Sequence, residues 1–185
     1  MPGAVSETEL VERDGVLLRP IDEDDLTALL RFRWDPATAG EYQWFGFRID
    51  DALALERRWQ HDGLISSDSA SFLAVGAADG ACAGWVTWRP LPFGNLEIGV
   101  GLFPDYRGRG VGTIAHRLLV DYLFATTTAH RIQAGTEVDN MAERRALERV
   151  GFQLEGVQRG IGFRGGEWRD GVMYSILRSD SRPAA

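Results

Sequence analysis

The chain has 185 residues, of which 44% are hydrophobic, 10% aromatic and 25% charged. This length and composition predict one ordinary globular domain and exclude a disordered or fibrous chain. The 20 basic residues, all of them arginine, stand against 27 acidic ones and give a net charge of -7, which argues against nonspecific nucleic-acid binding. The single cysteine, Cys82, excludes an internal disulfide and any metal site built on cysteine pairs.

The N-terminal residues and the most apolar stretch of the chain indicate where in the cell the protein is expected. The first residues carry no signal-peptide pattern, and the apolar stretch from Ser69 to Trp88 is interrupted by polar residues and falls short of a membrane span. We therefore expect a cytoplasmic protein with no membrane partner. One domain is expected over residues 11–178, with residues 1–10 and 179–185 as loose ends.

Hydrophobic periodicity and turn residues predict the elements in chain order. They are a strand at 16–19, a helix that Asp22 caps and that reaches Trp34, a helix at 51–61, a hairpin of strands at 71–75 and 83–88, a strand at 95–102, a helix at 111–124, a strand at 131–137, a helix at 140–150 and two strands within 160–177. The last helix has Asn140 as its cap and Gly151 as a left-handed stop. The class expected is mixed α/β.

The strand at 95–102 has one almost bare face. Strict alternation from Leu96 to Leu102 places apolar side chains on one face and Glu97, Gly99 and Gly101 on the other. Glycine weakens a strand interior, so two glycines in alternation indicate a bulge or the close approach of a ligand to the backbone.

A glycine-rich turn follows this strand and leads straight into a helix. It spans Arg107–Gly112, and the N–H groups of such a turn, together with the positive end of the helix, can bind a pyrophosphate. The dinucleotide fingerprint fails because its last glycine falls at Thr113, and the nucleoside-triphosphate loop fails because the chain has no lysine. The remaining pattern, R-x-x-G-x-G after a strand, resembles the general N-acetyltransferase (GNAT) superfamily.

The resemblance extends over nearly the whole chain. Residues 151–159 resemble the "GF-x-x-EG-x-x-R" signature of the RimJ/RimL-type branch, and residues 15–35 and 168–175 resemble its opening and closing segments. The resemblance implies the GNAT fold, a mixed and mostly antiparallel sheet flanked by helices. It also implies an acyltransferase, an N-acetyltransferase with acetyl-CoA as co-substrate and without a metal.

The resemblance also implies which residues hold the cofactor. Backbone of the strand would pair with the pantetheine arm, the glycine-rich turn would cradle the pyrophosphate with help from two arginines, and Asn140 would reach the pantetheine or thioester end. The cofactor-binding residues predicted in this way are Val100, Gly101, Leu102, Arg107, Gly108, Arg109, Gly110, Val111, Gly112 and Asn140.

The family reaction, attack of a neutral amine on the thioester, needs a general base and donors for the developing oxyanion. Glu97, on the bare face of the cofactor strand, is the first candidate for the base, and Glu137, on the neighbouring strand, is the second. An ion pair with arginine is the alternative role of each. Glu143 stands where the branch usually has a serine near the CoA sulfur, and a capping box with Asn140 explains it without catalysis. Leu147 stands where other GNAT members have a tyrosine acid, so no side-chain acid is evident.

The aromatic residues Tyr42, Trp44 and Phe45 are predicted to wall an acceptor pocket. The acceptor expected is a primary amine: the α-amine of a peptide, protein N-terminus or amino-acid-like compound, or an amine-bearing small molecule such as an antibiotic. Two alternatives stay open. One is another acyl donor such as succinyl-CoA, with Arg89 and Arg164 as unplaced cations, and the other is a non-catalytic acyl-CoA sensor. The sequence also leaves a homodimer open.

The three histidines and the cysteine are expected to have structural or surface roles. His61, His116 and His130 do not have the spacing of metal ligands. Cys82 is expected to be a small packing residue.

Overall fold

The computed structural model describes residues 11–43, 52–78 and 80–181. The strands are β1 (Val11–Arg13), β2 (Val16–Arg19), β3 (Ser71–Gly76), β4 (Cys82–Pro90), β5 (Leu96–Leu102), β6 (Arg131–Glu137), β7 (Gln153–Arg164) and β8 (Glu167–Leu177). The α-helices are α1 (Glu23–Trp34), α2 (Pro36–Ala39), α3 (Ala52–Asp62), α4 (Val111–Thr126) and α5 (Met141–Val150). Within these described ranges, no helix is both long and apolar enough to cross a membrane.

The predicted elements are confirmed with small shifts at their ends, and two short elements were missed. β1 pairs with β2 across a turn at Asp14 and Gly15, and it precedes the first strand that the sequence predicted, at 16–19. α2 is a single turn of helix that the Asp35 side chain caps. The closing hairpin begins earlier than predicted, at Gln153.

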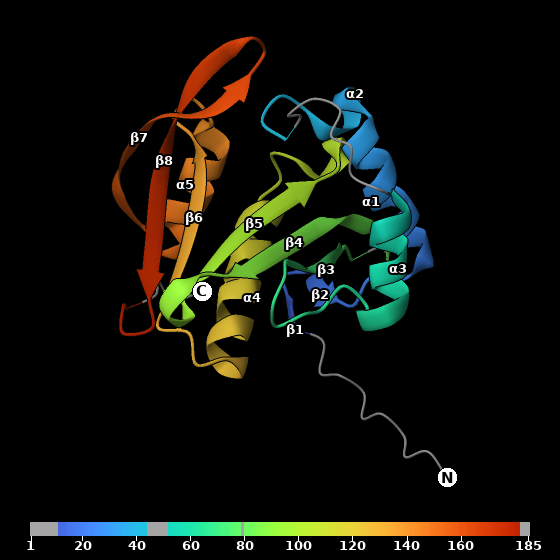
Figure 1. Cartoon of the computed structure of the whole chain (residues 1–185). Helices are drawn as coiled ribbons and strands as arrows, with labels where there is room; N and C mark the ends of the chain where they lie inside the picture. The colour runs from blue at the N-terminus through green and yellow to red at the C-terminus, as the bar shows by residue number, and fades with distance from the viewer. Residues whose placement is uncertain (1–10, 44–51, 79, 182–185) are drawn as a thin grey trace.

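The strands form one mixed sheet in the order β1-β2-β3-β4-β5-β6-β8-β7. All pairs are antiparallel except β5 with β6, which is parallel and joins only Leu96 to Ile132 and Glu97 to Gln133. Beyond these two residue pairs the strands diverge, so the sheet opens into a V between β5 and β6 (Figure 1). The mixed, mostly antiparallel sheet flanked by helices is the architecture that the sequence predicted.

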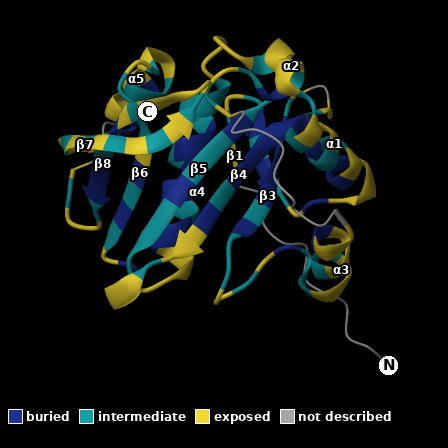
Figure 2. Ribbon diagram, turned by 45° about the horizontal axis from the view of Figure 1, so that its top comes forward, coloured by how far each residue is buried: buried dark blue, intermediate teal, exposed yellow. Residues whose placement is uncertain are grey.

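Two hydrophobic clusters pack on the sheet. The larger one combines α4 and α5 residues such as Leu119, Leu123 and Leu147 with strand residues such as Ile132 and Ile176. The smaller one joins α1 and α3 to β3 and β4. Figure 2 shows that buried residues concentrate in the strands and on the inner sides of the helices. Burial of each large apolar side chain contributes about 1.5–3 kcal/mol, so these clusters hold the helices to the sheet.

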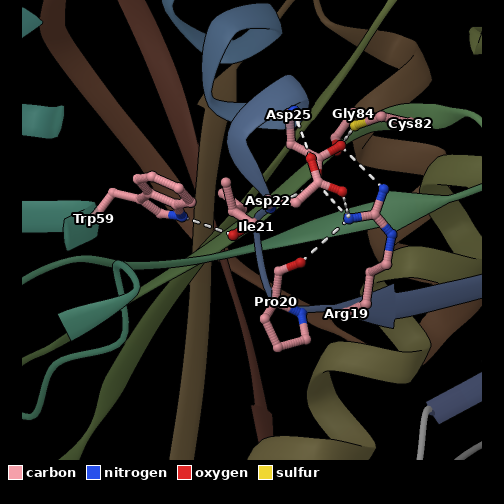
Figure 3. A network of polar contacts seen from close by, with 8 residues as sticks. All are labelled: Arg19, Pro20, Ile21, Asp22, Asp25, Trp59, Cys82 and Gly84. Atoms are coloured by element: carbon pink, nitrogen blue, oxygen red, sulfur yellow. Dashed lines mark hydrogen bonds and ion pairs between the residues drawn. The ribbon is translucent and has the colours of Figure 1, made fainter.

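The start of α1 is fixed by a network of polar contacts around the buried Asp25 (Figure 3). Asp22 and Asp25 form a capping box, and Arg19 binds the Asp25 carboxylate in two places. Burial by itself would raise the pKa of Asp25, but the hydrogen bonds from Arg19 and from the backbone outweigh it and lower that pKa. Cys82 lies beside Asp25, and burial raises the pKa of its thiol to about 12. The thiol is therefore a packing group here and a poor nucleophile.

Candidate active site

The two edges of β5 differ in their hydrogen bonding. On one edge, every residue from Leu96 to Leu102 has a partner on β4 in an unbroken register, so the bulge considered in the sequence analysis is absent from this pair. On the other edge, the Val100 carbonyl accepts a hydrogen bond of 3.2 Å from Gln43, and the Leu102 carbonyl accepts one of 2.9 Å from Arg107. Since a residue's N–H and C=O point to the same edge in an antiparallel pair, Val100 and Leu102 turn their backbone toward the V.

The bare face of β5 is covered by an aromatic ring from β4. A Cβ on Gly101 would lie 2.7 Å from the Trp85 ring, and a Cβ on Gly99 would lie 3.1 Å from the Thr87 hydroxyl. Gly101 is buried for this reason, and it does not line the cavity described below. The missing side chain of Gly101 leaves room for the Trp85 ring.

The glycine-rich turn ends at the N-terminus of α4. Gly108 and Gly110 have φ angles of 71° and 83°, which side chains other than glycine rarely adopt. Gly110 caps the helix without a side-chain hydrogen bond, and no side chain in the described ranges accepts from the first N–H groups of this 16-residue helix. Unpaired N–H groups at the positive end of a helix can bind a phosphate group.

A cavity of about 420 Å³ joins the open edge of β5 to this turn and to α5. Its lining residues come from the segment after α2, from β5, from the turn and from α5. They are Ala39, Gly40, Glu41, Tyr42, Gln43, Val100, Leu102, Arg107, Gly108, Gly110, Gly112, Thr113, Asn140, Ala142, Glu143, Arg145, Ala146 and Arg149. Most of the predicted cofactor-binding residues therefore meet in one cavity. Gly101, Arg109 and Val111 are not among its lining residues.

Arg107 lines the cavity but does not project freely into it. Its guanidinium donates to the backbone carbonyls of Leu102, Thr38 and Ala39. Gly40 gives it space, since a Cβ there would lie 2.7 Å from Nη1 of Arg107. Burial lowers the pKa of Arg107, and no carboxylate contributes to that shift. Its positive charge stays available to a bound anion, while its hydrogen bonds fix the turn to the segment after α2.

Two further arginines on α5 line the cavity and were missed by the sequence analysis. Arg145 and Arg149 lie one helical turn apart, which puts them on the same side of α5. Neither guanidinium has a carboxylate partner in the described ranges. The i, i+4 spacing was visible in the sequence, but a run of charged residues on a helix usually marks a solvated face. Three arginines thus surround the cavity in a chain of negative net charge.

Asn140 occupies the predicted place at the start of α5, where its side chain is already engaged. Its Oδ1 accepts from the Glu143 N–H at 3.3 Å, which caps the helix, and its Nδ2 donates to the Thr136 hydroxyl at 2.9 Å. One amide hydrogen of Asn140 has no partner among these contacts. The cap is as expected, but the reciprocal half of the capping box is missing, because the Glu143 carboxylate contacts His116 instead.

Glu97, the first candidate for the base, lies outside the cavity lining. Strand alternation puts its side chain on the face opposite to those of Val100 and Leu102. Arg89 donates to its Oε1 at 2.9 and 2.6 Å, and Gln133 donates to its Oε2 at 2.9 Å. This is the ion-paired alternative that the sequence left open, and the catalytic role of Glu97 stays a prediction.

Glu137, the second candidate, is held even more firmly. Arg164 donates to both carboxylate oxygens, at 2.7 and 2.6 Å, and also to Glu41 at 3.2 Å. The hydrogen bonds from Arg164 lower the pKa of Glu137. A carboxylate with a lowered pKa is a weaker base, so these contacts favour the structural role, although catalysis by Glu137 is not tested.

One of the three predicted acceptor-pocket residues lies in the described part of the chain. Tyr42 lines the cavity, its ring lies 5.3 Å from the Arg164 guanidinium carbon, and its hydroxyl donates to the Asp139 carbonyl. Trp44 and Phe45 lie outside the described residues. Tyr42 and Arg164 connect the segment after α2 to the β7–β8 hairpin, so residues from both halves of the sheet meet at this wall.

Comparison with known proteins now decides the family. The sequence model of the family described as "Acetyltransferase (GNAT) domain" matches residues 16–153. The chain belongs to the GNAT family. "Probable N-acetyltransferase YjcK" of Bacillus subtilis (strain 168) is 30% identical over 173 residues, which cover 89% of this chain and 95% of that protein. "Putative ribosomal N-acetyltransferase YdaF" from the same strain is 32% identical over 104 residues, covering 55% of this chain and 57% of that protein.

Solved GNAT structures share the fold at lower identity. Spermidine N-acetyltransferase from Vibrio cholerae, in complex with CoA and spermine, has a TM-score of 0.77 and 21% identity, covering 90% of this chain and 98% of that one. Mycobacterium smegmatis RimJ, in complex with CoA-disulfide, has a TM-score of 0.70 and 23% identity, covering 88% of this chain and 82% of that one. Membership of the RimJ/RimL-like branch is thus confirmed, and this GNAT protein is an acetyl-CoA-dependent N-acetyltransferase.

Proposed function

We propose that this enzyme binds acetyl-CoA in the cavity between β5 and α5 and transfers its acetyl group to a primary amine. The main support for this proposal is that one cavity brings three features together. They are an open strand edge at Val100 and Leu102, the N-terminus of α4, and three arginines without carboxylate partners in the described ranges. An open strand edge can hydrogen-bond an extended chain of amides such as pantetheine. The helix end and the arginines suit phosphate groups.

The residues that would hold acetyl-CoA follow from this arrangement. Gly108, Gly110 and Gly112 would give the pyrophosphate access to the first N–H groups of α4, while Arg107, Arg145 and Arg149 would supply positive charge. Bound acetyl-CoA supplies the activated acetyl group. Asn140 has one amide hydrogen left with which to position it.

The acceptor that we propose is the α-amine of a peptide, protein N-terminus or amino-acid-like compound, with amine-bearing small molecules as the second class. Membership of the RimJ/RimL-like branch supports the α-amine, because YdaF carries a ribosomal acceptor in its name. The polyamine named in the Vibrio cholerae structure supports the second class. Tyr42 at the cavity wall offers an aromatic surface to either.

Another acyl donor has less support. A dicarboxylic acyl group would need a cation near the thioester, and Arg89 and Arg164 were the candidates. Arg89 is paired with Glu97, and Arg164 is paired with Glu137 and Glu41. Neither arginine therefore offers a free positive charge to the donor.

The test is CoA release from acetyl-CoA against amino acids, N-terminal peptides of ribosomal proteins, polyamines and amine antibiotics, with product masses measured. We expect acceptor-dependent release and a gain of one acetyl group. Saturable acetyl-CoA binding without release on the whole panel would favour the sensor alternative. No binding at all would overturn the cavity assignment.

A matched pair of variants at Gly110 separates binding from folding. Gly110→Asn and Gly110→Asp introduce residues of similar shape that tolerate a positive φ, and both can cap a helix. The aspartate adds a negative charge where we place the pyrophosphate. We expect Gly110→Asp to bind CoA more than tenfold more weakly than Gly110→Asn, with equal thermal stability.

A further inference from the structure

A buried histidine and a glutamate form a pair at the cavity wall, and neither the family comparison nor the proposed cofactor contacts account for it. His116, on α4, is 0% exposed, and its Nε2 lies 2.7 Å from Oε1 of Glu143, on the first turn of α5. The Glu143 side chain is 23% exposed and lines the cavity. The pair therefore connects the protein interior to the place where we put acetyl-CoA.

The two ring nitrogens of His116 have different surroundings. Its Nδ1 is buried and has no hydrogen-bond partner among the described residues. A proton on Nδ1 would leave a buried donor unpaired, and a charged imidazolium without a second partner would be costlier still. The arrangement favours a neutral ring with its proton on Nε2, which donates to Glu143. His116 then fixes Oε1 of Glu143 and leaves Oε2 without a partner in the described ranges.

A comparison of the carboxylates in and near the cavity also favours Glu143 as the group that takes part in proton transfer. Glu41 and Glu143 are the acidic residues among the lining residues of the described structure. Glu41 is 65% exposed and is bound to Arg164. Glu97 and Glu137 are held by arginines and lie outside the lining. Glu143 is thus the cavity carboxylate that no arginine binds in the described ranges, and a histidine sets its orientation.

We propose that Glu143 is a catalytic residue that carries a proton from the attacking nitrogen to the departing sulfur, and that His116 is its positioning residue. The inference rests on the proposed placement of acetyl-CoA in the cavity. As the amine attacks, a C–N bond forms and the C–S bond breaks. Oε2 of Glu143 takes a proton from the nitrogen and gives it to the sulfur. The products are the amide and CoA thiol, and the carboxylate is restored in each turnover.

One carboxylate can serve both atoms, because nitrogen and sulfur are bonded to the same carbon during the transfer. The arrangement also supplies the side-chain acid that the sequence analysis did not find. Arg164 lowers the pKa of Glu137, so that carboxylate is a poor proton acceptor, whereas no arginine binds Glu143 in the described ranges. Glu97 stays a candidate for the separate removal of a proton from the acceptor ammonium.

The first experiment compares Glu143→Gln with Glu148→Gln, a matched change on the same helix outside the cavity lining. Acetyl-CoA is the donor, and an alanyl peptide and spermidine are the acceptors. We expect Glu143→Gln to lower kcat about 100-fold, as loss of a proton-transfer group does, with the KM for acetyl-CoA nearly unchanged. Glu148→Gln should keep wild-type kcat. Wild-type kcat in Glu143→Gln would overturn the proposal.

A second experiment uses the thiol of bound CoA and needs no acceptor. The thiolate absorbs in the ultraviolet, and the negative charge of Glu143 beside the sulfur should delay its appearance to higher pH. Glu143→Gln should therefore shift the ionisation of bound CoA to lower pH relative to wild type. Cys82 does not interfere, because its pKa is about 12. The other charged or titratable groups that line the cavity are Glu41, Tyr42, Arg107, Arg145 and Arg149, and they are the same in both proteins. Equal ionisation would contradict the placement of Glu143.

The positioning role of His116 has its own readouts. Nitrogen NMR of the imidazole in the protein without CoA should show a neutral ring protonated on Nε2, and protonation on Nδ1 would contradict the role. His116→Leu removes the donor and should lower kcat about tenfold, because misplacement of a reacting group by about 1 Å can cost up to about 100-fold. His116→Gln retains a donor and should restore part of the loss, whereas a merely structural role predicts equal kcat in folded variants.

These outcomes separate the proposal from the function on which it rests. If wild-type protein binds CoA and acetylates an amine while Glu143→Gln does so equally well, the proposal for Glu143 and His116 fails and the transferase function stands. If wild-type protein neither binds CoA nor releases it from acetyl-CoA, the placement of the cofactor fails, and the proposal fails with it.

Discussion

The two edges of β5 consist of the same seven residues but differ in their pairing with neighbouring strands. The edge toward β4 is paired along its whole length, and on the adjoining face the Trp85 ring lies against Gly101. The edge toward β6 is paired at Leu96 and Glu97 and then opens into the cavity. The difference shows how one strand can hold a binding edge rigid: the closed edge fixes the position of the backbone groups that the open edge presents.

The same contrast separates the acidic residues. At the closed end of the V, Glu97 forms an ion pair with Arg89 and accepts a hydrogen bond from Gln133, and across the gap Glu137 forms an ion pair with Arg164. At the open side, Glu143 has a histidine as its partner. The arginine pairs connect strands of the sheet, and the carboxylate without an arginine is the one to which we assign the proton transfer.

The largest expected effect comes from breaking the closed edge. A Cβ on Gly84 of β4 would lie 2.0 Å from the Gly101 carbonyl oxygen and 2.8 Å from Cα of Leu102. Backbone atoms on a paired strand cannot yield easily, so Gly84→Ala should lower the free energy of unfolding by about 3 kcal/mol. Urea unfolding measures this loss. Gly162→Ala on β7, where a Cβ meets nothing within 4 Å, is the matched control and should change stability by less than about 0.5 kcal/mol.

The next effect concerns the cations on the open side. Arg145→Glu and Arg149→Glu should each weaken CoA binding about 10- to 100-fold at low salt, since a charge-assisted hydrogen bond contributes about 1.5–3 kcal/mol. Titration calorimetry gives the affinities, and the loss should shrink as salt rises. Arg159→Glu on β7 makes the same charge change away from the cavity. Equal weakening by all three variants would show a general charge effect and remove the two α5 arginines from the site.

A smaller effect is expected in the strands beyond the V. Arg131 binds Glu155 at 2.5 and 2.6 Å, and its hydrogen bonds lower the pKa of Glu155 from 4.5 to about 2. This pair is fully stabilising above pH 4.5, and its contribution is lost as the pH falls toward about 2. The Glu155 side chain is 42% exposed, so the contribution is at most about 1 kcal/mol. Glu155→Gln should remove that part of the acid dependence from thermal melts, and an unchanged dependence would assign it to other carboxylates.

The smallest effect is expected for chemical labelling of Cys82, at the start of β4. Its thiol has a pKa of about 12 because burial disfavours the thiolate. Iodoacetamide at pH 8 should leave folded protein unmodified over hours and should label it promptly after denaturation. Rapid labelling of folded protein would mean that the Arg19–Asp25 network opens readily.

Local patterns accounted for most of the fold. The capped helices, the alternating strands and the hairpin turn each depend on neighbouring residues, so periodicity and cap residues were enough to predict them. β1 and α2 were missed because segments of three and four residues carry too little periodicity. No local pattern encodes where β5 and β6 part, because their pairing joins segments that are distant in the sequence.

The candidate site was predictable to the extent that it is local. The glycine-rich turn is contiguous, and it was found. The contact between Trp85 and Gly101 could not be predicted, because the ring comes from a neighbouring strand, and cofactor binding by Gly101 stays a prediction. The His116–Glu143 pair was missed because its members are 27 residues apart and meet only when α4 packs on α5. Arg107 was assigned to phosphate, but its hydrogen bonds go to three carbonyls that the sequence did not place beside it.

The most direct measurement is a titration of the labelled protein with CoA, followed by backbone amide NMR. If the open edge of β5 binds the cofactor, the amides of Val100 and Leu102 and those of residues 108–113 should shift and saturate together, while the β7–β8 amides stay in place. Saturable shifts confined to β7 and β8, or no shift at any concentration, would contradict the assignment of this cavity to CoA.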